Sequence, residues 1–416
     1  MANLLSYPSL VESPFIIVEI GGYTFGSYDN TGSRLGGKVT YPNFMSQINI
    51  VKINGQVNTY TIRMTYQITK GDDPNMLDAV FSKNKDKYGW QKIKISYGDW
   101  ACPSYIYKEE EAIISKINSR IDFSNSRIEY ELNCTSTSLP LTSNAFTFPA
   151  VTAKPSDILL KLLTNKAYGL QSIFTGMTSK SKVIDSGVIT SDDKAVKIEA
   201  KDGISILSYM NYLVSCMSCI TDPEDSIIKK TKYYLTLEDD ILGKMGGPFF
   251  KVTKVNANEQ TKASQDSADT FTVDVGYPGN NFVLGFSINN NELWSIYYNY
   301  TKNLPQTNYV YSIDNEGNLI TTYSPAISTS KDLKYTTESS KTWWTSMTEF
   351  PVTATLTIKG LMRPSILMSK VRINSYFYGV KHISSGLYII TRQEDSVSSS
   401  GYRTTLTLTR IGADVS

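Results

Sequence analysis

Residues 60–68, YTIRMTYQI, alternate strictly between two kinds of side chain, and this pattern constrains the fold more than any other stretch. One face carries apolar and aromatic side chains: Tyr60, Ile62, Met64, Tyr66 and Ile68. The other face carries polar ones: Thr61, Arg63, Thr65 and Gln67. A period of two residues is typical of a β-strand. The stretch therefore predicts a strand with one buried face and one face in water.

Residues 14–138 repeat strands and turns. Asn54-Gly55 lies between two apolar runs and predicts a hairpin, because both residues tolerate positive φ. A second hairpin is expected to turn at Gly98-Asp99, and a third lies within residues 119–136. Pro74 follows two aspartates and predicts the start of a helix of one or two turns. At least five strands with short connections predict a barrel or a sandwich, and the 28 tyrosines of the chain also favour β-structure.

The period changes after residue 146. Residues 154–169, KPSDILLKLLTNKAYG, place leucines and an isoleucine four residues apart, which is typical of an amphipathic helix. A second helix is expected within residues 201–225, with a core-facing stripe formed by Ile206, Met210, Leu213 and Met217. Residues 146–230 therefore predict a small two-helix α+β module.

Strands return beyond residue 230 and continue to the C-terminus, where residues 350–416 contain four strand candidates. No internal repeat of fixed period stands out. The expected fold is mainly β with α+β parts: two antiparallel β-barrel-like domains with the two-helix module inserted between them. The expected divisions are a first barrel at 1–145, the module at 146–230, a second, split barrel at 231–289 and 346–416, and an irregular aromatic-rich insertion at 290–345.

The sequence offers little catalytic material. His382 is the only histidine, and it lies in a tyrosine-rich strand region where a structural role is expected. A single imidazole also argues against a catalytic zinc site, which takes two or three. Cys216-x-x-Cys219 has the spacing of a redox or metal motif, but its apolar helical surroundings favour buried, unreactive thiols. No catalytic, cofactor-binding or metal-binding residue is therefore predicted, and no cofactor is expected.

The charges are balanced, with 41 basic and 39 acidic residues, so no broad field is expected to attract nucleic acid or anionic lipid. The N-terminal residues lack the basic start and long apolar run of a secretory signal. No segment has the ~20 apolar residues of a membrane-spanning helix, so no membrane anchor is expected.

The C-terminal region adds a pattern that spans several strands. GLMRP at 360–364 and YFYGVKH at 376–382 precede two strand-forming stretches. The residues that define those stretches are Gly386, Tyr388, Gly401, Thr404, Leu406, Leu408 and Arg410. This pattern resembles the end of the tail hub, or baseplate hub, proteins of tailed bacteriophages, which are related to the hub part of type VI secretion spike proteins. Residues 53–82 are similar to the first barrel of that family.

The resemblance implies a structural virion protein without enzymatic activity. It implies a homotrimer whose two barrel-like domains per subunit form a pseudo-sixfold ring between the tail tube protein and the central spike or tail tip protein. Viral DNA and the tape measure protein would pass through the lumen without sequence recognition. Arg63, Thr65 and Gln67 would then line the lumen or meet a neighbouring subunit. The expected location is the virion tail or baseplate, assembled in the bacterial host cytoplasm.

Two alternatives remain open at this point. Aromatic residues such as Trp343-Trp344 could serve a glycan-binding, adhesin-like module of the tail. Acidic groups such as Glu109-Glu110-Glu111 and Asp239-Asp240 could supply the two carboxylates of a wall-degrading glycosidase. The first alternative is a binding function, and the second is an enzymatic one.

Overall fold

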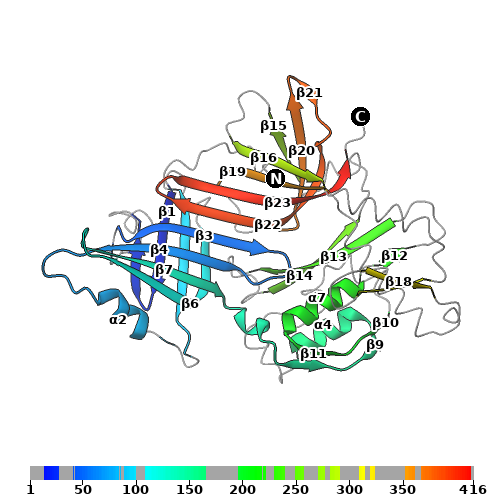
Figure 1. Ribbon diagram of the computed structural model, residues 1–416, viewed down its shortest axis with the longest axis horizontal. Coiled ribbons are helices and arrows are strands. Elements are labelled where there is room, and N and C mark those ends of the chain that lie inside the picture. Colours follow the sequence, from blue (N-terminus) through cyan, green and yellow to red (C-terminus); the bar gives the residue numbers. More distant parts are fainter. Residues whose placement is uncertain are drawn as a thin grey trace.

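The computed structural model consists mainly of strands, which form three regions (Figure 1). The residues that it describes are 14–27, 41, 43–83, 85, 89–99, 108–164, 195–217, 219–221, 229–238, 249–256, 270–276, 282–290, 309–313, 319–323, 352–360 and 367–413. The first region holds the N-terminal strands, the second holds the longer helices α4 and α7, and the third holds the C-terminal strands. The mainly β fold with a small helical insert predicted from the sequence is confirmed.

The first region, the N-terminal unit, is built from seven strands and one helix. They are β1 (Pro14–Ile20), β2 (Tyr23–Gly26), β3 (Met45–Ile53), β4 (Thr59–Gln67), α2 (Met76–Lys83), β5 (Lys92–Asp99), β6 (Lys108–Asp122) and β7 (Arg127–Ser136). The predicted alternation is confirmed, since Tyr60, Ile62, Met64 and Tyr66 are buried and Arg63 and Gln67 are exposed. The turn at Asn54-Gly55 is also confirmed, and Gly55 has a φ of 69°.

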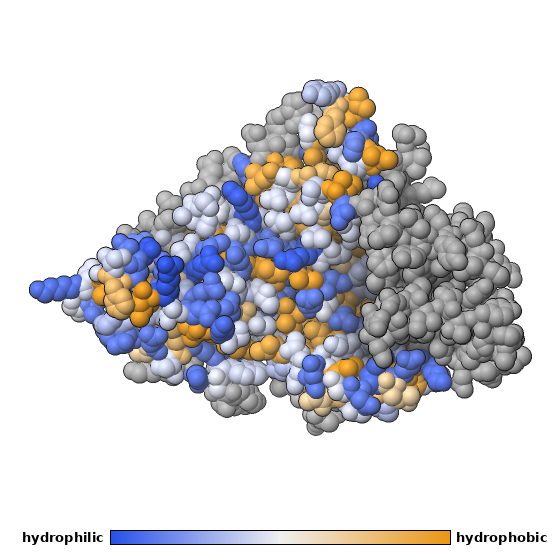
Figure 2. Space-filling view, viewed as in Figure 1, coloured by the Kyte–Doolittle hydropathy of each residue, from blue (hydrophilic) through white to orange (hydrophobic). Residues whose placement is uncertain are grey.

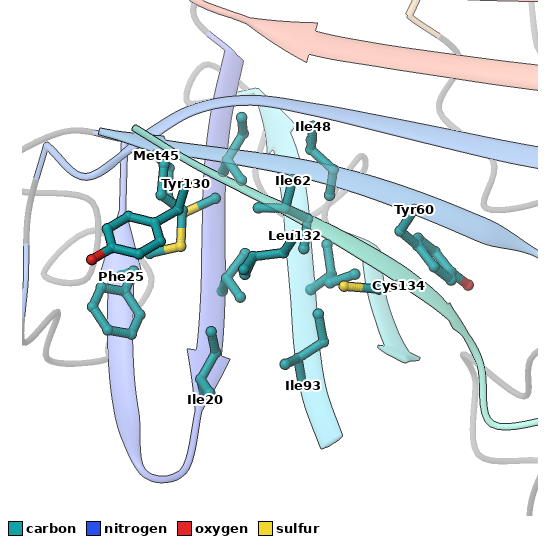
Figure 3. Close-up of a cluster of buried hydrophobic side chains, with 14 of the residues drawn as sticks. Ile20, Phe25, Met45, Ile48, Tyr60, Ile62, Ile93, Tyr130, Leu132 and Cys134 are labelled. Atoms are coloured by element: carbon teal, nitrogen blue, oxygen red, sulfur yellow. The ribbon is translucent and has the colours of Figure 1, made fainter. Parts of the chain in front are cut away.

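The core of the N-terminal unit lies between its strands. Side chains from β3, β4 and β7 meet those of β1, β2 and β5, as Figure 3 shows for Ile62, Leu132 and Ile93. Helix α2 adds Leu77, Val80 and Phe81 to this core. It spans two turns after Pro74, as the sequence predicts, because its apolar residues can pack on the same core.

The expected turn at Gly98-Asp99 is wrong. Both residues belong to β5, where Gly98 pairs with Phe15 and Asp99 with Pro14. The glycine tolerates a strand when the neighbouring strand β1 supplies a full antiparallel ladder, so the tertiary pairing overrides the local turn preference.

The second region is the helical module. Its elements are a 3-10 helix (Leu139–Thr142), β8 (Phe146–Phe148), β9 (Val151–Ala153), α4 (Pro155–Thr164), β10 (Val196–Ile198), β11 (Lys201–Ile204), α7 (Ile206–Met217), β12 (Cys219–Thr221), β13 (Lys229–Glu238) and β14 (Phe249–Asn256). The predicted α7 stripe of Ile206, Met210, Leu213 and Met217 is buried throughout. The Ser205 hydroxyl caps α7 by accepting the backbone N–H of Ser208.

Strands β13 and β14 lie at and just beyond the boundary expected at residue 230. Strands β13 and β14 contribute Leu235, Leu237 and Phe250 to the core around α4 and α7. The same two strands also contribute Tyr234 and Val255 to a small buried cluster with Leu387 and Ile389 of β22. They therefore pack both against the helices and against the C-terminal strands.

The third region, the C-terminal unit, consists of β15 (Thr270–Val275), β16 (Val283–Asn290), β19 (Val352–Lys359), β20 (Lys370–Phe377), β21 (Val380–Lys381), β22 (Gly386–Ser398) and β23 (Gly401–Ala413). A separate two-stranded sheet pairs β17 (Tyr309–Ile313) with β18 (Leu319–Tyr323) inside the aromatic-rich segment, where IDNEGNLITTYSP at 313–325 is typical of a hairpin. The core of the C-terminal unit is formed by apolar side chains including Leu356, Ile373 and Leu408.

The two strand units share one sheet, because β22 pairs with β3. The main path through this 14-stranded sheet runs β16-β19-β23-β22-β3-β4-β7-β6-β5-β1-β2. Figure 1 shows β22 and β3 side by side where the units meet. Two separate barrels were expected from the sequence, whereas among the described residues the ladders run through both units and do not close into a barrel.

Candidate functional site: a polar sheet face with open edges

One face of the shared sheet is polar across both units. A single row of paired residues follows it from β19 to β6: Lys359, Arg403, Ser396, Asn49, Thr61, Asn133 and Lys116. The opposite face of the same strands is apolar and covered by the cores of the two units. Figure 2 shows hydrophilic residues predominating where β3, β4, β7 and β6 lie.

Charges on this face are neutralised locally. Arg63 Nε lies 3.2 Å from Glu131 Oε2, and the Arg63 guanidinium also donates to Gln47. Arg392 and Glu394 form a similar pair on β22, at 2.9 Å. Pairs this exposed add little stability, because water screens them. Their effect is a surface that is hydrophilic without a concentrated charge of one sign.

The residues singled out from the YTIRMTYQI strand lie on this face. Arg63 and Gln67 are exposed and Thr65 is half-buried on β4. Gln67 donates to the backbone oxygen of Asn125 in the β6–β7 turn, at 2.8 Å. The structure thus places these three side chains on the polar face, and their contact with a lumen or neighbour remains a proposal.

The shared sheet contains the same four-stranded arrangement twice. In the N-terminal unit the order across the sheet is β3-β4-β7-β6. Counted among themselves along the chain, these four strands are the first, second, fourth and third. In the C-terminal unit the order is β16-β19-β23-β22, which repeats that sequence of positions. Every neighbouring pair is antiparallel. The two units therefore also point in the same direction along the sheet.

Two β-bulges occupy equivalent places in the two units. Ser115 is the extra residue of β6 against β7, and Thr391 is the extra residue of β22 against β23. Each hydroxyl donates to a backbone oxygen of the paired strand, Ser115 to Asn133 at 2.8 Å and Thr391 to Thr407 at 3.3 Å. A bulge fixes register and twist, so its repetition supports a duplicated unit.

A second pair of bulges also occupies equivalent places in the two units. The register of β3 against β4 shifts between Met45 and Gln47, and that of β16 against β19 shifts between Val283 and Gly285. The sequence carries a short trace of the duplication, since AIISK at 112–116 aligns with YIITR at 388–392. A single five-residue match is too short to identify a repeat without the strand topology.

Buried polar groups lie where the units meet. Lys52 on β3 pairs with Glu110 on β6 at 2.8 Å, and both side chains are almost fully buried. The Tyr97 hydroxyl donates to the same Glu110 oxygen at 2.9 Å. Burial and the Glu110 charge raise the pKa of Tyr97 well above its usual value. The pair was not predicted from the sequence, because Lys52 occupies a position on the otherwise apolar, buried face of β3.

A second buried polar group sits on the C-terminal hairpin. Asp395 on β22 accepts from Gln393 at 2.8 Å and from Thr404 at 2.5 Å. The Tyr402 ring contacts the Tyr97 ring edge-on, with centroids 5.9 Å apart. Burial and the Asp395 charge raise the pKa of Tyr402 well above its usual value. These groups connect the hairpin β22–β23 to the core of the N-terminal unit.

The remaining C-terminal residues identified from the sequence all lie on this hairpin. Tyr388, Leu406 and Leu408 are fully buried, and Tyr388 pairs across the strands with Arg410. Gly386 and Gly401 begin β22 and β23. The hairpin joins β19 to β3 within one sheet, through β23 and β22, whereas the sequence predicted that these residues close a second barrel.

The candidate catalytic groups have structural surroundings. His382 lies in the turn between β21 and β22, where its Nδ1 is 2.8 Å from the Ser384 hydroxyl and its ring meets Phe377 edge-on. It is therefore a turn residue and not a strand residue. Burial raises the pKa of the Cys216 thiol to about 11. Trp343-Trp344 and Asp239-Asp240 lie outside the described residues.

No metal or membrane element emerges from the described ranges. In those ranges no three His, Cys, Asp or Glu side chains gather as a metal ion would require. None of the helices found there has the length and apolar character needed to cross a bilayer.

Comparison with known proteins identifies the fold. No protein-family model and no curated protein matches the sequence. A tail protein from Neisseria meningitidis MC58 matches the structure with a TM-score of 0.51 and 10% identity, covering 96% of this chain and 97% of that one. A 43 kDa tail protein of prophage MuSo2 from Shewanella oneidensis matches with a TM-score of 0.49 and 11% identity, covering 96% and 99%. The c3393 protein of E. coli, a component of the type VI secretion system, matches with a TM-score of 0.46 and 10% identity, covering 88% and 73%. The Neisseria tail protein match confirms the resemblance to phage tail proteins at the level of the fold.

Proposed function

We propose that this chain is a structural, non-enzymatic subunit of a phage tail hub, and that three copies close into a ring around a channel. The observation that carries the proposal is the tandem four-stranded unit, repeated in one sheet with the same order and direction. Three chains with two units each supply six similar units, which suits a junction between a sixfold tail tube and a threefold spike. The shared fold with a bacterial tail protein supports the same assignment.

The polar face suits the lumen of this ring. Its ion pairs and hydroxyl side chains keep it wet without gathering a basic surface that would hold DNA phosphates. Viral DNA and the tape measure protein would therefore pass without being retained. Arg63, Thr65 and Gln67 would contribute to that lining in each copy.

The flanking partners follow from the position of such a ring. The tail tube protein would bind one end and the central spike or tail tip protein the other, in the tail or baseplate of the virion. Assembly would take place in the bacterial host cytoplasm. A load-bearing role is supported by the unbroken antiparallel ladder from β16 to β6, which runs across both units.

Light scattering and negative-stain electron microscopy of the purified chain test the proposal. A mass of three chains and rings with a central channel are expected at high protein concentration. A chain that stays monomeric at every concentration would contradict the ring. Release of peptidoglycan fragments by the purified chain would contradict the non-enzymatic assignment.

A further inference from the structure

Strand β22 has two different partners along one of its edges. Its first residues, 386–389, pair with β20, and residues 392–398 pair with β3. The bulge at Thr391 separates the two parts. The first part serves the core of the C-terminal unit, and the second part joins that unit to the N-terminal one.

Strand β6 is the equivalent of β22, but it has a partner along only the first part of the corresponding edge. Residues 108–113 pair with β5, and the bulge at Ser115 follows at the equivalent place. Among the described residues, nothing pairs with the same edge beyond the bulge, over residues 116–122. Strand β16, the equivalent of β3, likewise has an open outer edge within the described part of the chain. Each unit therefore presents one half of a junction that is seen complete between β22 and β3.

Some of the exposed apolar side chains lie on these two open edges. Ile121 is 54% exposed, whereas its equivalent at the internal junction, Val397, is fully buried. Ile288 is 42% exposed, whereas its equivalent Ile50 is fully buried. Ile117 adds a third exposed apolar side chain on the β6 edge. An exposed isoleucine on an open strand edge favours pairing with another strand.

We propose that β6 of one copy pairs with β16 of the next, in the register that β22 and β3 already show within the chain. This inference rests on the proposed ring and names the contact that closes it. The internal pairs are Glu394–Val51, Ser396–Asn49 and Val397–Ile48. When β6 is aligned with β22, and β16 with β3, at their bulges, each internal pair corresponds to a pair between two copies. The predicted pairs, with the second residue on the neighbouring copy, are Asn118–Asn289, Arg120–Ser287 and Ile121–Phe286.

Strand direction agrees with this contact. The path from β16 to β6 contains four strands of each unit and alternates in direction at every step. Because the number of strands is even, β6 runs opposite to β16. A rotated copy therefore places its β16 antiparallel to β6, like every other neighbour on the path. The contact is head-to-tail, and such a contact generates a ring when the rotation closes.

Disulfide cross-linking tests the register. Asn118→Cys with Asn289→Cys, and Arg120→Cys with Ser287→Cys, place cysteines directly opposite each other. Opposite Cα atoms in an antiparallel pair are about 4.5–5.5 Å apart, within the range that a disulfide spans. Mild oxidation is expected to give covalent dimers and trimers on non-reducing gels. The unmodified chain, treated in the same way, reports any cross-linking through its four native cysteines.

The matched controls exchange the partners of the same four positions. Asn118→Cys with Ser287→Cys, and Arg120→Cys with Asn289→Cys, are each two residues out of register. Their Cα atoms would be about 7–8 Å apart, beyond disulfide reach. Cross-linking of the matched pairs but not the exchanged pairs supports the proposal. Rings without matched cross-links, or with equal cross-linking of both sets, overturn the register and leave the ring function standing.

Ile121→Asp provides a second measurement. Because this side chain is exposed in the single chain, the variant should fold, and circular dichroism should match the unmodified protein. Assembly should require at least about tenfold more protein, since a buried isoleucine is replaced by a charge. Ile383→Asp makes the same exchange at an exposed isoleucine in the turn before β22, away from both edges, and as the control should leave assembly unchanged. Equal assembly of Ile121→Asp and unmodified chains overturns the contact, and a monomeric unmodified chain overturns both the ring and the contact.

Discussion

The buried pair Lys52–Glu110 should be the most costly single interaction to break at the junction of the two units. Its nitrogen and oxygen are 2.8 Å apart, and the two side chains are 3% and 0% exposed. Lys52→Met keeps the length of the side chain but removes its charge. The Glu110 carboxylate then stays buried without its cation, which costs about 3–5 kcal/mol of unfolding free energy. That is a large part of the ~5–15 kcal/mol that stabilises a typical protein.

Urea unfolding followed by circular dichroism measures this cost. The double variant Lys52→Met/Glu110→Gln removes both charges and keeps an oxygen acceptor for the Tyr97 hydroxyl. It should recover most of the lost free energy, because neutralising both partners removes the uncompensated charge. Arg63→Met is the matched control, since it breaks the exposed Arg63–Glu131 pair and should cost less than about 1 kcal/mol.

A loss below about 1 kcal/mol for Lys52→Met would refute the reasoning, because it would show that the carboxylate is not held in a dry interior. A double variant no more stable than the single one would do the same.

Three further outcomes follow from the same structure. The free energy of unfolding should fall above pH ~10, which is the usual pKa of tyrosine. The raised pKa values of Tyr97 and Tyr402 keep both side chains protonated in the folded chain, whereas they ionise in the unfolded chain. Urea unfolding at pH 8 and 10.5 checks this, and Tyr97→Phe should weaken the pH dependence. Gly55→Val should loosen the contact between the β3–β4 turn and α7, because Gly55 has a positive φ and a Cβ there would meet the Asn211 side chain. A lower melting temperature is expected, and an unchanged melting temperature would argue against the contact. His382→Ala should leave ring assembly unchanged in light scattering, whereas lost assembly would show that this turn supports the ring.

The sequence predicts the strands well where burial alternates over a single face. Tyr60 and Met64 point into the core as the period of two requires, and the α7 stripe is buried as the period of 3.6 requires. The turn at Asn54-Gly55 was predictable because both residues favour positive φ. These features depend on neighbours within a few residues, which a single sequence displays.

The shared sheet could not be predicted in the same way. Pairing of β22 with β3 joins residues more than 300 positions apart, and nothing local in either strand specifies the other. The duplication was also hidden, because its two units share strand order and bulge positions but few residues. Lys52 lies on the buried face of β3, and nothing local in the sequence identifies Glu110 as its partner. The polar residues of β4 were identified from the sequence, but the open edges of β6 and β16 were not.

An electron cryo-microscopy reconstruction of the assembled chain tests the central claim most directly. We expect a ring of three copies, with the polar face of β4 and β7 lining the channel and β6 of each copy beside β16 of the next. A ring in which that face points outward, or particles that contain only single chains, would contradict the claim.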